Sequence, residues 1–369
     1  MADETPGTTR RGFVVGAAAA AGAAVAAGAT GWLLGRDGDP TTPDAGSSPV
    51  AGSSPDAAPS PETTALPAAH RRAGITWPPV PQRHLVLRVL TIDGAAGLDL
   101  PALVAAAAPA PQPADAGEVT VVVGYAPVHA LRLWPERASA ASDLPAFAND
   151  AAGMISGGDL AVQVCAETAS GARDAADGVV AALGSQVLWE QTGYRDAPTP
   201  HGTARTSTGF VDGIVNPRTA ELLEAGVWTD AVHRDTHLVV RRMVVSADFG
   251  AQPVEAQERA IGRSRSTGAP LSGGGPDDDV DLFAKTADGR LRTPTASHAR
   301  RAHPSHIGRP LMLRRSYSFD PPVGAGLVFV ACMNDPQTFV MTQRRLDEMD
   351  DLIAHTRTDA SGCFFVPGE

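Results

Sequence analysis

Cysteine and positive charge are both scarce in this chain. The three cysteines, Cys165, Cys332 and Cys363, stand far apart, which excludes a disulfide framework and a cysteine-rich zinc site. The formal net charge is −11, with 30 basic against 41 acidic residues, so the basic face that nucleic-acid binding requires is missing. Neither a P-loop nor a glycine-rich dinucleotide fingerprint is present. We therefore expect three buried thiols and no nucleic-acid partner.

Residues 1–35 have the pattern of an export signal. Arg10 and Arg11 precede Phe13, and from there to Leu34 the chain is almost entirely Ala, Gly and Val. An arginine pair before an apolar run is typical of the twin-arginine route. A transmembrane anchor is the alternative, but a run this rich in Ala and Gly is only weakly apolar. We expect the twin-arginine translocase to export the protein to an extracellular or cell-envelope location.

The rest of the chain divides by composition and periodicity. Residues 36–70 are mainly Pro, Ser, Thr, Ala, Gly and Asp, a composition that favours a linker without secondary structure. Strand and helix patterns then alternate in two similar halves, 71–200 and 201–369, which predicts an α+β fold of two ferredoxin-like units. We expect strands at 84–92, 119–124, 159–166, 186–194, 237–245, 326–332 and 363–366, and helices at 98–108, 169–183, 254–262 and 336–350.

Four segments of the second half carry the chemistry-bearing residues. The first, 209–217, places an acid between an aromatic residue and a glycine and closes with Asn-Pro; alone it predicts only a turn. The four segments are Gly-Phe-Val-Asp-Gly-Ile-Val-Asn-Pro at 209–217, Ile-Gly-Arg-Ser-Arg-Ser-Thr-Gly-Ala-Pro-Leu at 261–271, Ser-His-Ala-Arg-Arg-Ala-His-Pro at 297–304 and Leu-Met-Leu-Arg-Arg-Ser-Tyr-Ser at 311–318.

In this order and spacing, the four segments resemble the signature of the dye-decolorizing (DyP-type) haem peroxidases. The resemblance runs from about His84 to the C-terminus. It implies two ferredoxin-like units packed together as in the dimeric α+β barrels, with haem b held by the second unit. It also implies that hydrogen peroxide and small organic reductants are the substrates. The sequence indicates neither the physiological reductant nor the oligomeric state.

A haem protein needs an axial ligand to the iron, and histidine is the common one. Three histidines lie close together, His298, His303 and His306, and the residues alone leave the choice among them open. The resemblance assigns the iron to His298, the histidine of the Ser-His-Ala-Arg motif. His303 and His306 are then polar residues near the site.

The resemblance also assigns two catalytic residues on the other side of the haem. Asp212 matches the distal acid, and a carboxylate ionised at neutral pH can accept a proton from peroxide. Arg314 matches the distal arginine, whose permanent charge can stabilise a departing oxygen. Arg315 is the alternative, but strand alternation places the two arginines on opposite faces. Ser316 stands where some subfamilies carry Asn.

The remaining candidates line the expected haem site. Gly213, Ile214 and Val215 follow Asp212 and are expected to contact the haem through backbone and apolar surface. Arg263 fits a haem propionate by its charge, or is a solvated arginine at a helix end. The loop 267–271 resembles a segment beside the haem. Further residues that serve either as core or as haem contacts are Met312, Phe329 and Phe339, and aromatic residues that could carry electrons are Trp134, Trp189, Trp228, Tyr194 and Tyr317.

Three functions follow, in order of expectation. The first is an exported haem peroxidase that oxidises dyes or phenols by one-electron steps. The second is an exported haem-handling, deferrochelatase-like protein of iron uptake, in which the distal residues matter less than haem release. The third, a binding module without haem, conflicts with the four motifs.

Overall fold

The computed structural model describes residues 66–107, 119–199 and 202–368. The predicted export signal and most of the predicted linker lie outside these residues. The end of the linker is described, and there our expectation was wrong: Ala68–His70 form a 3-10 turn (η1), and Leu66 packs against the core.

Ten strands of the described chain form one sheet, and two more form a hairpin. The hairpin consists of β6 (Ala204–Arg205) and β7 (Val211–Asp212). The sheet consists of β1 (His84–Thr91), β2 (Thr120–Tyr125), β3 (Asp150–Ser156), β4 (Leu160–Ala166), β5 (Gln186–Tyr194), β8 (Thr236–Val245), β9 (Leu313–Arg314), β10 (Tyr317–Phe319), β11 (Ala325–Met333) and β12 (Thr356–Val366).

The strand order repeats between the two halves of the chain. The order is β10-β5-β1-β4-β2-β12-β8-β11-β9, and all these pairs are antiparallel. Within each half, the last strand lies beside the first and the third beside the second, as in a ferredoxin-like βαββαβ unit. Because β10 bonds to both β11 and β5, the sheet closes on itself as a barrel. The predicted α+β fold of two ferredoxin-like units is confirmed.

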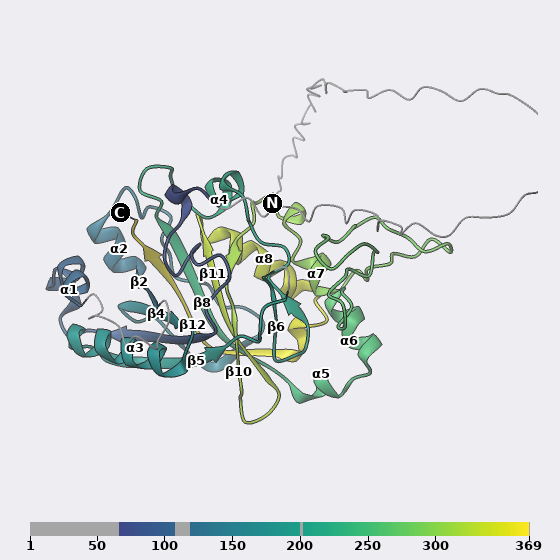
Figure 1. The fold of residues 1–369 in the computed structure, drawn as a ribbon, viewed down its shortest axis with the longest axis horizontal. Coiled ribbons are helices and arrows are strands. Elements are labelled where there is room, and N and C mark those ends of the chain that lie inside the picture. Colours follow the sequence, from purple (N-terminus) through teal and green to yellow (C-terminus); the bar gives the residue numbers. More distant parts are fainter. Residues whose placement is uncertain (1–65, 108–118, 200–201, 369) are drawn as a thin grey trace, which may run out of the picture. The chain divides into compact units, whose positions relative to one another are not determined.

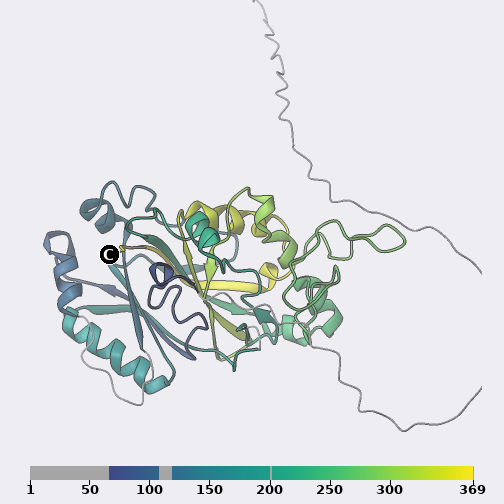
Figure 2. The same ribbon diagram turned by 45° about the horizontal axis from the view of Figure 1, so that its top comes forward.

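Helices cover the sheet on different sides. Figure 1 shows α1 to α3 beside the strands of the first half, while α7 and α8 lie beside the second half. In Figure 2, α3 and the segment of α5 and α6 again lie at opposite ends of the sheet. The helices are η2 (Ala95–Gly97), α1 (Leu100–Ala106), α2 (Pro127–Leu133), α3 (Ala169–Leu183), α4 (Ala220–Gly226), α5 (Ala247–Ala251), α6 (Val254–Ile261), α7 (His298–Arg301), η3 (Pro304–His306), α8 (Gln337–Glu348) and η4 (Ile353–His355).

Strand alternation separates the apolar residues into cores on the two faces of the sheet. Leu85, Leu87 and Val89 of β1 face Leu238 and Val240 of β8 across the barrel interior. On the outer face of the first half, a second core lies under the helices α1 to α3. On the outer face of the second half, a third core includes Val239, Ala331, Phe339 and Cys363.

The three cysteines are free and buried, as the sequence predicts. Burial raises the pKa of Cys332 and that of Cys363 to about 12, so both remain neutral thiols. No helix of the described residues is long and apolar enough to span a membrane.

The last strand was predicted too short. It begins at Thr356, not at residue 363, because β12 lies between β2 and β8 and its polar residues are buried there. Thr358 and Ser361 are at most 2% exposed, although their polar side chains interrupt any apolar run in the sequence. The sequence analysis also missed α2, β3 and α4, which are short or lack apolar alternation.

A buried ion pair joins three strands of the third core. Arg241 of β8 is 1% exposed and donates to the Asp150 carboxylate of β3 and to Ser361 of β12. Its guanidinium lies over the rings of Phe147 and Phe339, at 5.0 and 5.7 Å from their centroids. Asp150 is therefore the only carboxylate among the described residues that forms an ion pair with this buried charge.

We predict that Asp150→Ala destabilises the protein by about 3–5 kcal/mol, because it leaves the guanidinium buried and unpaired. Asp288→Ala is the matched control, since Asp288 pairs with Arg290 in solvent and its loss should cost under about 1 kcal/mol. Denaturant unfolding followed by circular dichroism measures both. Equal losses of unfolding free energy in the two variants would contradict the role of Asp150 as the partner of Arg241. Adding Arg241→Met to Asp150→Ala removes the unpaired charge and should restore part of the stability.

Candidate functional site

Asp212 is presented by the hairpin of β6 and β7. Ala204 pairs with Asp212 in register, so the carboxylate follows directly from the strand end. Gly213 then turns the chain with a φ of 86°, a conformation that residues with a Cβ rarely adopt. Arg218 fixes this turn by donating to the carbonyl of Gly213 at 3.2 Å. The predicted turn is confirmed, and it holds the side chain of Asp212 29% exposed.

Arg314 reaches Asp212 from β9, although 101 residues of sequence separate them. Its guanidinium lies 3.7 Å from the Asp212 carboxylate. The amide of Asn216 fixes the backbone of Arg314 on both sides: its Nδ2 donates to the Arg314 carbonyl at 2.8 Å, and its Oδ1 accepts from the Arg314 N–H at 3.0 Å. Asn216 therefore aligns the two charged segments.

Arg315 points the other way, as strand alternation predicts. Its guanidinium is buried and donates to the carbonyl of Ile75 at 2.7 Å. Burial lowers the pKa of Arg315. Ser316 is also buried, and its hydroxyl accepts from the N–H of Val330. Neither residue forms a hydrogen bond or ion pair with Asp212 in the described structure.

His298 is the first residue of α7, and a buried carboxylate orients its ring. Its Nδ1 lies 3.1 Å from Oδ2 of Asp350, which is fully buried. The other oxygen of Asp350 accepts from the N–H groups of Leu352 and Ile353. Burial lowers the pKa of His298, but the charge and hydrogen bond of Asp350 raise it more, so the net pKa lies above the ordinary value. The Nε2 atom has no hydrogen-bond partner within the described residues.

His298, Asp212 and Arg314 act on one another electrostatically. The charge of Arg314 lowers the pKa of His298, and the charge of Asp212 raises it. About a third of the His298 side chain is exposed, so Nε2 can be reached from outside the protein core. The site thus offers one oriented imidazole nitrogen and, within its electrostatic reach, a carboxylate paired with a guanidinium.

The other two histidines of this segment differ from His298. His303 has both ring nitrogens engaged, Nδ1 with the hydroxyl of Ser305 at 2.7 Å and Nε2 with the carboxylate of Asp279 at 3.1 Å. His306 lies against His303, and burial followed by the charge of Arg345 lowers its pKa. These contacts favour His298 as the residue with a free nitrogen, and its role as metal ligand stays a prediction.

Arg263 is not the solvated helix-end arginine of the alternative prediction. It is buried, and its guanidinium donates to the carbonyls of Gly268 and Asp278, each at 3.0 Å. Burial lowers the pKa of Arg263, and the nearby charge of Arg314 lowers it further. Arg263 therefore shapes the loop 267–271 beside the site, and its contact with a propionate stays a prediction.

The loop 267–271 lies against the Asp212 segment. At Gly268, where φ is 82°, an added Cβ would come within 3.4 Å of Val211 and 3.6 Å of Ile214. Ile214 is buried and Val215 is half-buried, so this side of the site is apolar. Met312 and Phe339 belong to the third core, with Phe329 packed against them.

The aromatic candidates for electron transfer are mostly interior. Trp189, Trp228 and Tyr317 are buried, and Trp134 is half-buried. Tyr194 is half-buried, and its hydroxyl donates to Asp320 at 2.8 Å. This hydrogen bond, more than burial, raises the pKa of Tyr194 to about 12.

Sequence reasoning missed three residues that organise the site. The sequence analysis used Asp350 only as the end of a predicted helix. Ligand histidines commonly pair with a carboxylate, and Asp350, 52 residues after His298, is that partner. Asn216 was taken only as a turn residue. Arg205 gave no local signal at all, yet it donates to the carbonyls of Gly209 at 2.8 Å and of Arg265 at 2.5 Å, and so joins the hairpin to the loop.

Two family models match most of the chain. The N-terminal model of Dyp-type peroxidases matches residues 87–195, and the C-terminal model matches residues 203–369. The fold is similar to the crystal structure of a DyP-type peroxidase from Streptomyces coelicolor, with a TM-score of 0.71 and 32% identity. That similarity covers 84% of this chain and 96% of the other.

Two curated relatives carry different names. The chain is 34% identical over 277 residues to the dye-decolorizing peroxidase of Thermobifida fusca. This alignment covers 68% of this chain and 64% of the relative. It is 27% identical over 284 residues to the deferrochelatase of Escherichia coli K12. That alignment covers 68% of this chain and 65% of the relative. The chain thus spans less than two thirds of the length of either relative.

We predict that Asn216→Ala loosens Arg314 and lowers the free energy of unfolding by about 1–3 kcal/mol, since it leaves two backbone groups of Arg314 without their partner. Asn334→Ala is the matched control, because Asn334 donates one exposed hydrogen bond to Ala225 and its loss should cost under about 1 kcal/mol. Denaturant unfolding compares the two. If Asn216→Ala costs no more than Asn334→Ala, Asn216 does not hold the segments together.

Proposed function

Because the chain belongs to the Dyp-type peroxidase family, we propose that it is a haem b peroxidase that reduces hydrogen peroxide and oxidises dyes or phenols by one-electron steps. The observation that carries the proposal is the pairing of His298 with Asp350, within electrostatic reach of the Asp212–Arg314 pair. This arrangement supplies an iron ligand, a proton carrier and a fixed cation.

The residues of the site fit haem by their chemistry. A ligand histidine usually donates its second ring nitrogen to a carboxylate, which orients the ring and makes the ligand nitrogen more basic. His298 has this partner in Asp350 at 3.1 Å, and its Nε2 is the free nitrogen. Bound haem supplies the iron at which peroxide is reduced. We assign His298 to the iron and Arg263, with Gly213, Ile214 and Val215, to the surroundings of the ring.

Asp212 is the proton carrier in this proposal. Its carboxylate accepts a proton from the near oxygen of peroxide and returns it to the far oxygen, which leaves as water. Gly213 and Arg218 fix the turn that presents this carboxylate. The guanidinium of Arg314 lies 3.7 Å from this carboxylate.

Arg314 stabilises the negative charge that develops as the oxygen–oxygen bond breaks. Its guanidinium stays charged at every relevant pH and is fixed by the backbone contacts of Asn216, so it needs little reorganisation during the reaction. The apolar side chains of Val211 and Ile214 lie beside Gly268 on one side of the site.

A haem-handling role in iron uptake is not favoured. Several relatives are named deferrochelatases, at 27–29% identity, but the relative named a dye-decolorizing peroxidase is more similar, at 34%. The aligned acid and cation are also groups that haem release does not require. We further propose export by the twin-arginine route, on the pattern of Arg10 and Arg11 before the apolar run.

His298→Ala should lose haem or change its absorbance spectrum, because His298 is the histidine of this segment whose ring a buried carboxylate orients. His303→Ala is the matched control and should keep the wild-type spectrum, since His303 is engaged with Ser305 and Asp279. Spectra of the purified variants after haem loading measure this. The opposite pattern would move the ligand to His303.

Asp212→Ala and Arg314→Leu should both slow the reaction with peroxide. Loss of the base costs about 10²–10⁴-fold where no water replaces it, and loss of one fixed charge costs about 3 kcal/mol. We expect Arg314 to matter at least as much as Asp212, because its loss also removes the partner of Asp212. Stopped-flow absorbance after mixing with peroxide, at several pH values, gives the rates.

Arg309→Leu is the control for these two variants, since Arg309 forms a comparable, partly exposed pair with Asp335. A wild-type rate in Arg314→Leu together with an inactive Asp212→Ala would show that Arg314 is not the main electrostatic group.

The double variant Arg10→Lys, Arg11→Lys should remain in the cytoplasm, because the twin-arginine route depends on the arginine pair. Cell fractionation and immunoblotting measure its location. Arg36→Lys, beyond the apolar run, is the control and should be exported. Normal export of the double variant would exclude the twin-arginine route.

A further inference from the structure

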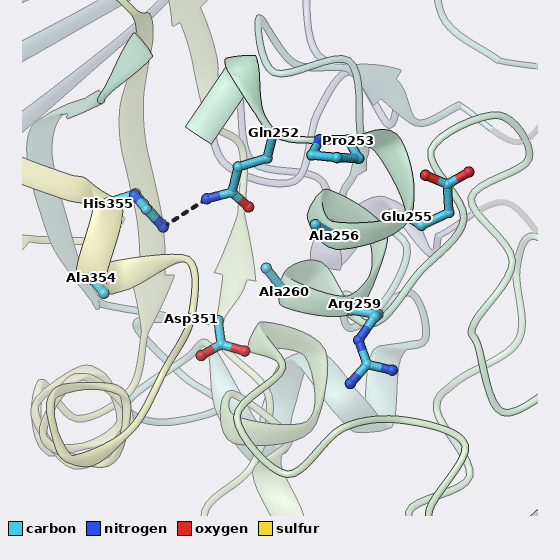
Figure 3. A pocket seen from close by; sticks show the side chains of 9 residues that line it. All are labelled: Gln252, Pro253, Glu255, Ala256, Arg259, Ala260, Asp351, Ala354 and His355. Atoms are coloured by element: carbon cyan, nitrogen blue, oxygen red, sulfur yellow. Dashed lines mark hydrogen bonds between the residues drawn. The ribbon is translucent and has the colours of Figure 1, made fainter. Parts of the chain in front are cut away.

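A pocket of about 520 Å³ lies between α6 and η4. Its volume is in the range that holds one small organic molecule. Figure 3 shows its side chains, which come from the start and body of α6 and from the segment after α8. The lining residues are Gln252, Pro253, Glu255, Ala256, Arg259, Ala260, Asp351, Ala354 and His355.

The pocket has an apolar wall and a polar one. Ala256 and Ala260 of α6 present their methyl groups to the hollow, while His355, Gln252 and Asp351 stand across from them (Figure 3). Nε2 of His355 lies 3.1 Å from Nε2 of Gln252. Because an amide nitrogen only donates, the imidazole nitrogen is the acceptor in this contact. A flat apolar ring with one hydroxyl group matches these two walls.

One wall of the pocket is joined directly to the His298 segment. Asp351 follows Asp350, whose carboxylate holds His298 at 3.1 Å. The N–H of Asp351 donates to the carbonyl of Ala296 at 2.9 Å, two residues before His298. The pocket therefore borders the segment that carries the proposed iron ligand.

The pocket is also joined to the Asp212 segment. The ring of His355 lies 5.7 Å from that of Phe249. Phe249 belongs to one buried cluster with Ala260 and Phe210, and Phe210 precedes Asp212 by two residues. A continuous set of packed groups thus connects the pocket with both sides of the candidate site.

We propose that this pocket binds the reducing substrate, a small neutral phenol, whose hydroxyl takes the place of the Gln252 amide on Nε2 of His355 and whose ring lies on Ala256 and Ala260. This inference rests on the proposed peroxidase function. Glu255 and Asp351 place two carboxylates at the pocket against one guanidinium, that of Arg259. An anionic dye would meet net negative charge there, so the pocket selects uncharged donors.

The chemistry at the pocket is the loss of one hydrogen atom from the phenol. The O–H bond breaks, the proton passes to the imidazole of His355, and the electron passes through the packed segment to the peroxide site. Two phenols reduce one hydrogen peroxide to two waters and leave as two phenoxyl radicals, so atoms and electrons balance.

The first test measures binding without turnover. Guaiacol is titrated into the haem-loaded full-length protein without peroxide, by calorimetry. Ala256→Phe and, from the other wall, Ala354→Phe fill the pocket and should weaken binding by about tenfold or more. Ala354 is exposed, so its variant keeps the test valid if Ala256→Phe fails to fold.

Ala169→Phe is the matched control. Ala169 lines a second pocket of about 430 Å³ beside Tyr194, which is the rival place for a donor. Guaiacol affinity should stay within about twofold of wild type in this variant. Weaker binding in Ala169→Phe with wild-type binding in the other two would overturn the proposal and move the donor to Tyr194. Unchanged binding in all three variants would also overturn it.

The second test concerns the proton. Ferrocyanide gives up an electron and no proton, so it serves as the reference donor. His355→Gln should lower the ratio of kcat/KM for guaiacol to that for ferrocyanide by about 10²-fold, the usual contribution of a general base. An unchanged ratio would overturn the role of His355.

The proposed peroxidase function and the proposed donor pocket can be disproved separately. If wild-type protein binds no haem or does not react with peroxide, the proposed function is wrong. If the wild-type protein reacts with peroxide but guaiacol affinity is unchanged in Ala256→Phe and Ala354→Phe, only the assignment of the donor to this pocket is wrong.

Discussion

The buried carboxylate of Asp350 is the contact on which the second half of the molecule depends. Three groups bond to it: the ring of His298 and the N–H groups of Leu352 and Ile353. A carboxylate with no exposed surface needs such partners, because an unpaired buried charge costs several kcal/mol. Through these bonds, Asp350 holds the segment after α8 against the start of α7. It therefore sets the orientation of the imidazole and one wall of the pocket between α6 and η4.

The electrostatics of the site are a balance between groups of opposite sign. Burial and Arg314 disfavour a positive charge on His298, whereas Asp350 and Asp212 favour it. A ligand to iron needs the ring neutral at the bonding nitrogen but electron-rich, and a carboxylate on the opposite nitrogen provides this. The pair formed by Asp212 and Arg314 keeps the other side of the site close to neutral. In the proposed function, uncharged peroxide approaches this pair before any charge develops.

The regular elements could be predicted because their patterns are local. The alternation in residues 186–194 and the apolar stripe in 169–183 gave β5 and α3 to the residue. The polar half of β12 could not be predicted, since its burial comes from neighbours distant in sequence. At the site, motif order indicated Asp212, His298 and Arg314, but the groups that position them did not stand out. Asp350, Asn216 and Arg205 act through hydrogen bonds across 52, 98 and 60 residues, which no local pattern encodes.

Separate places for peroxide and donor are physically compatible in one small domain. In the proposed function, peroxide must meet a base and a cation within hydrogen-bond reach, so its site needs fixed polar groups. A donor needs only to lose an electron and a proton, and the electron can pass through packed side chains. The proton cannot travel that way, which is why a donor pocket requires its own acceptor at the surface. His355 is half-buried, its ring lies 5.7 Å from that of Phe249 and it contacts Gln252, so it meets that requirement where the phenol hydroxyl would lie.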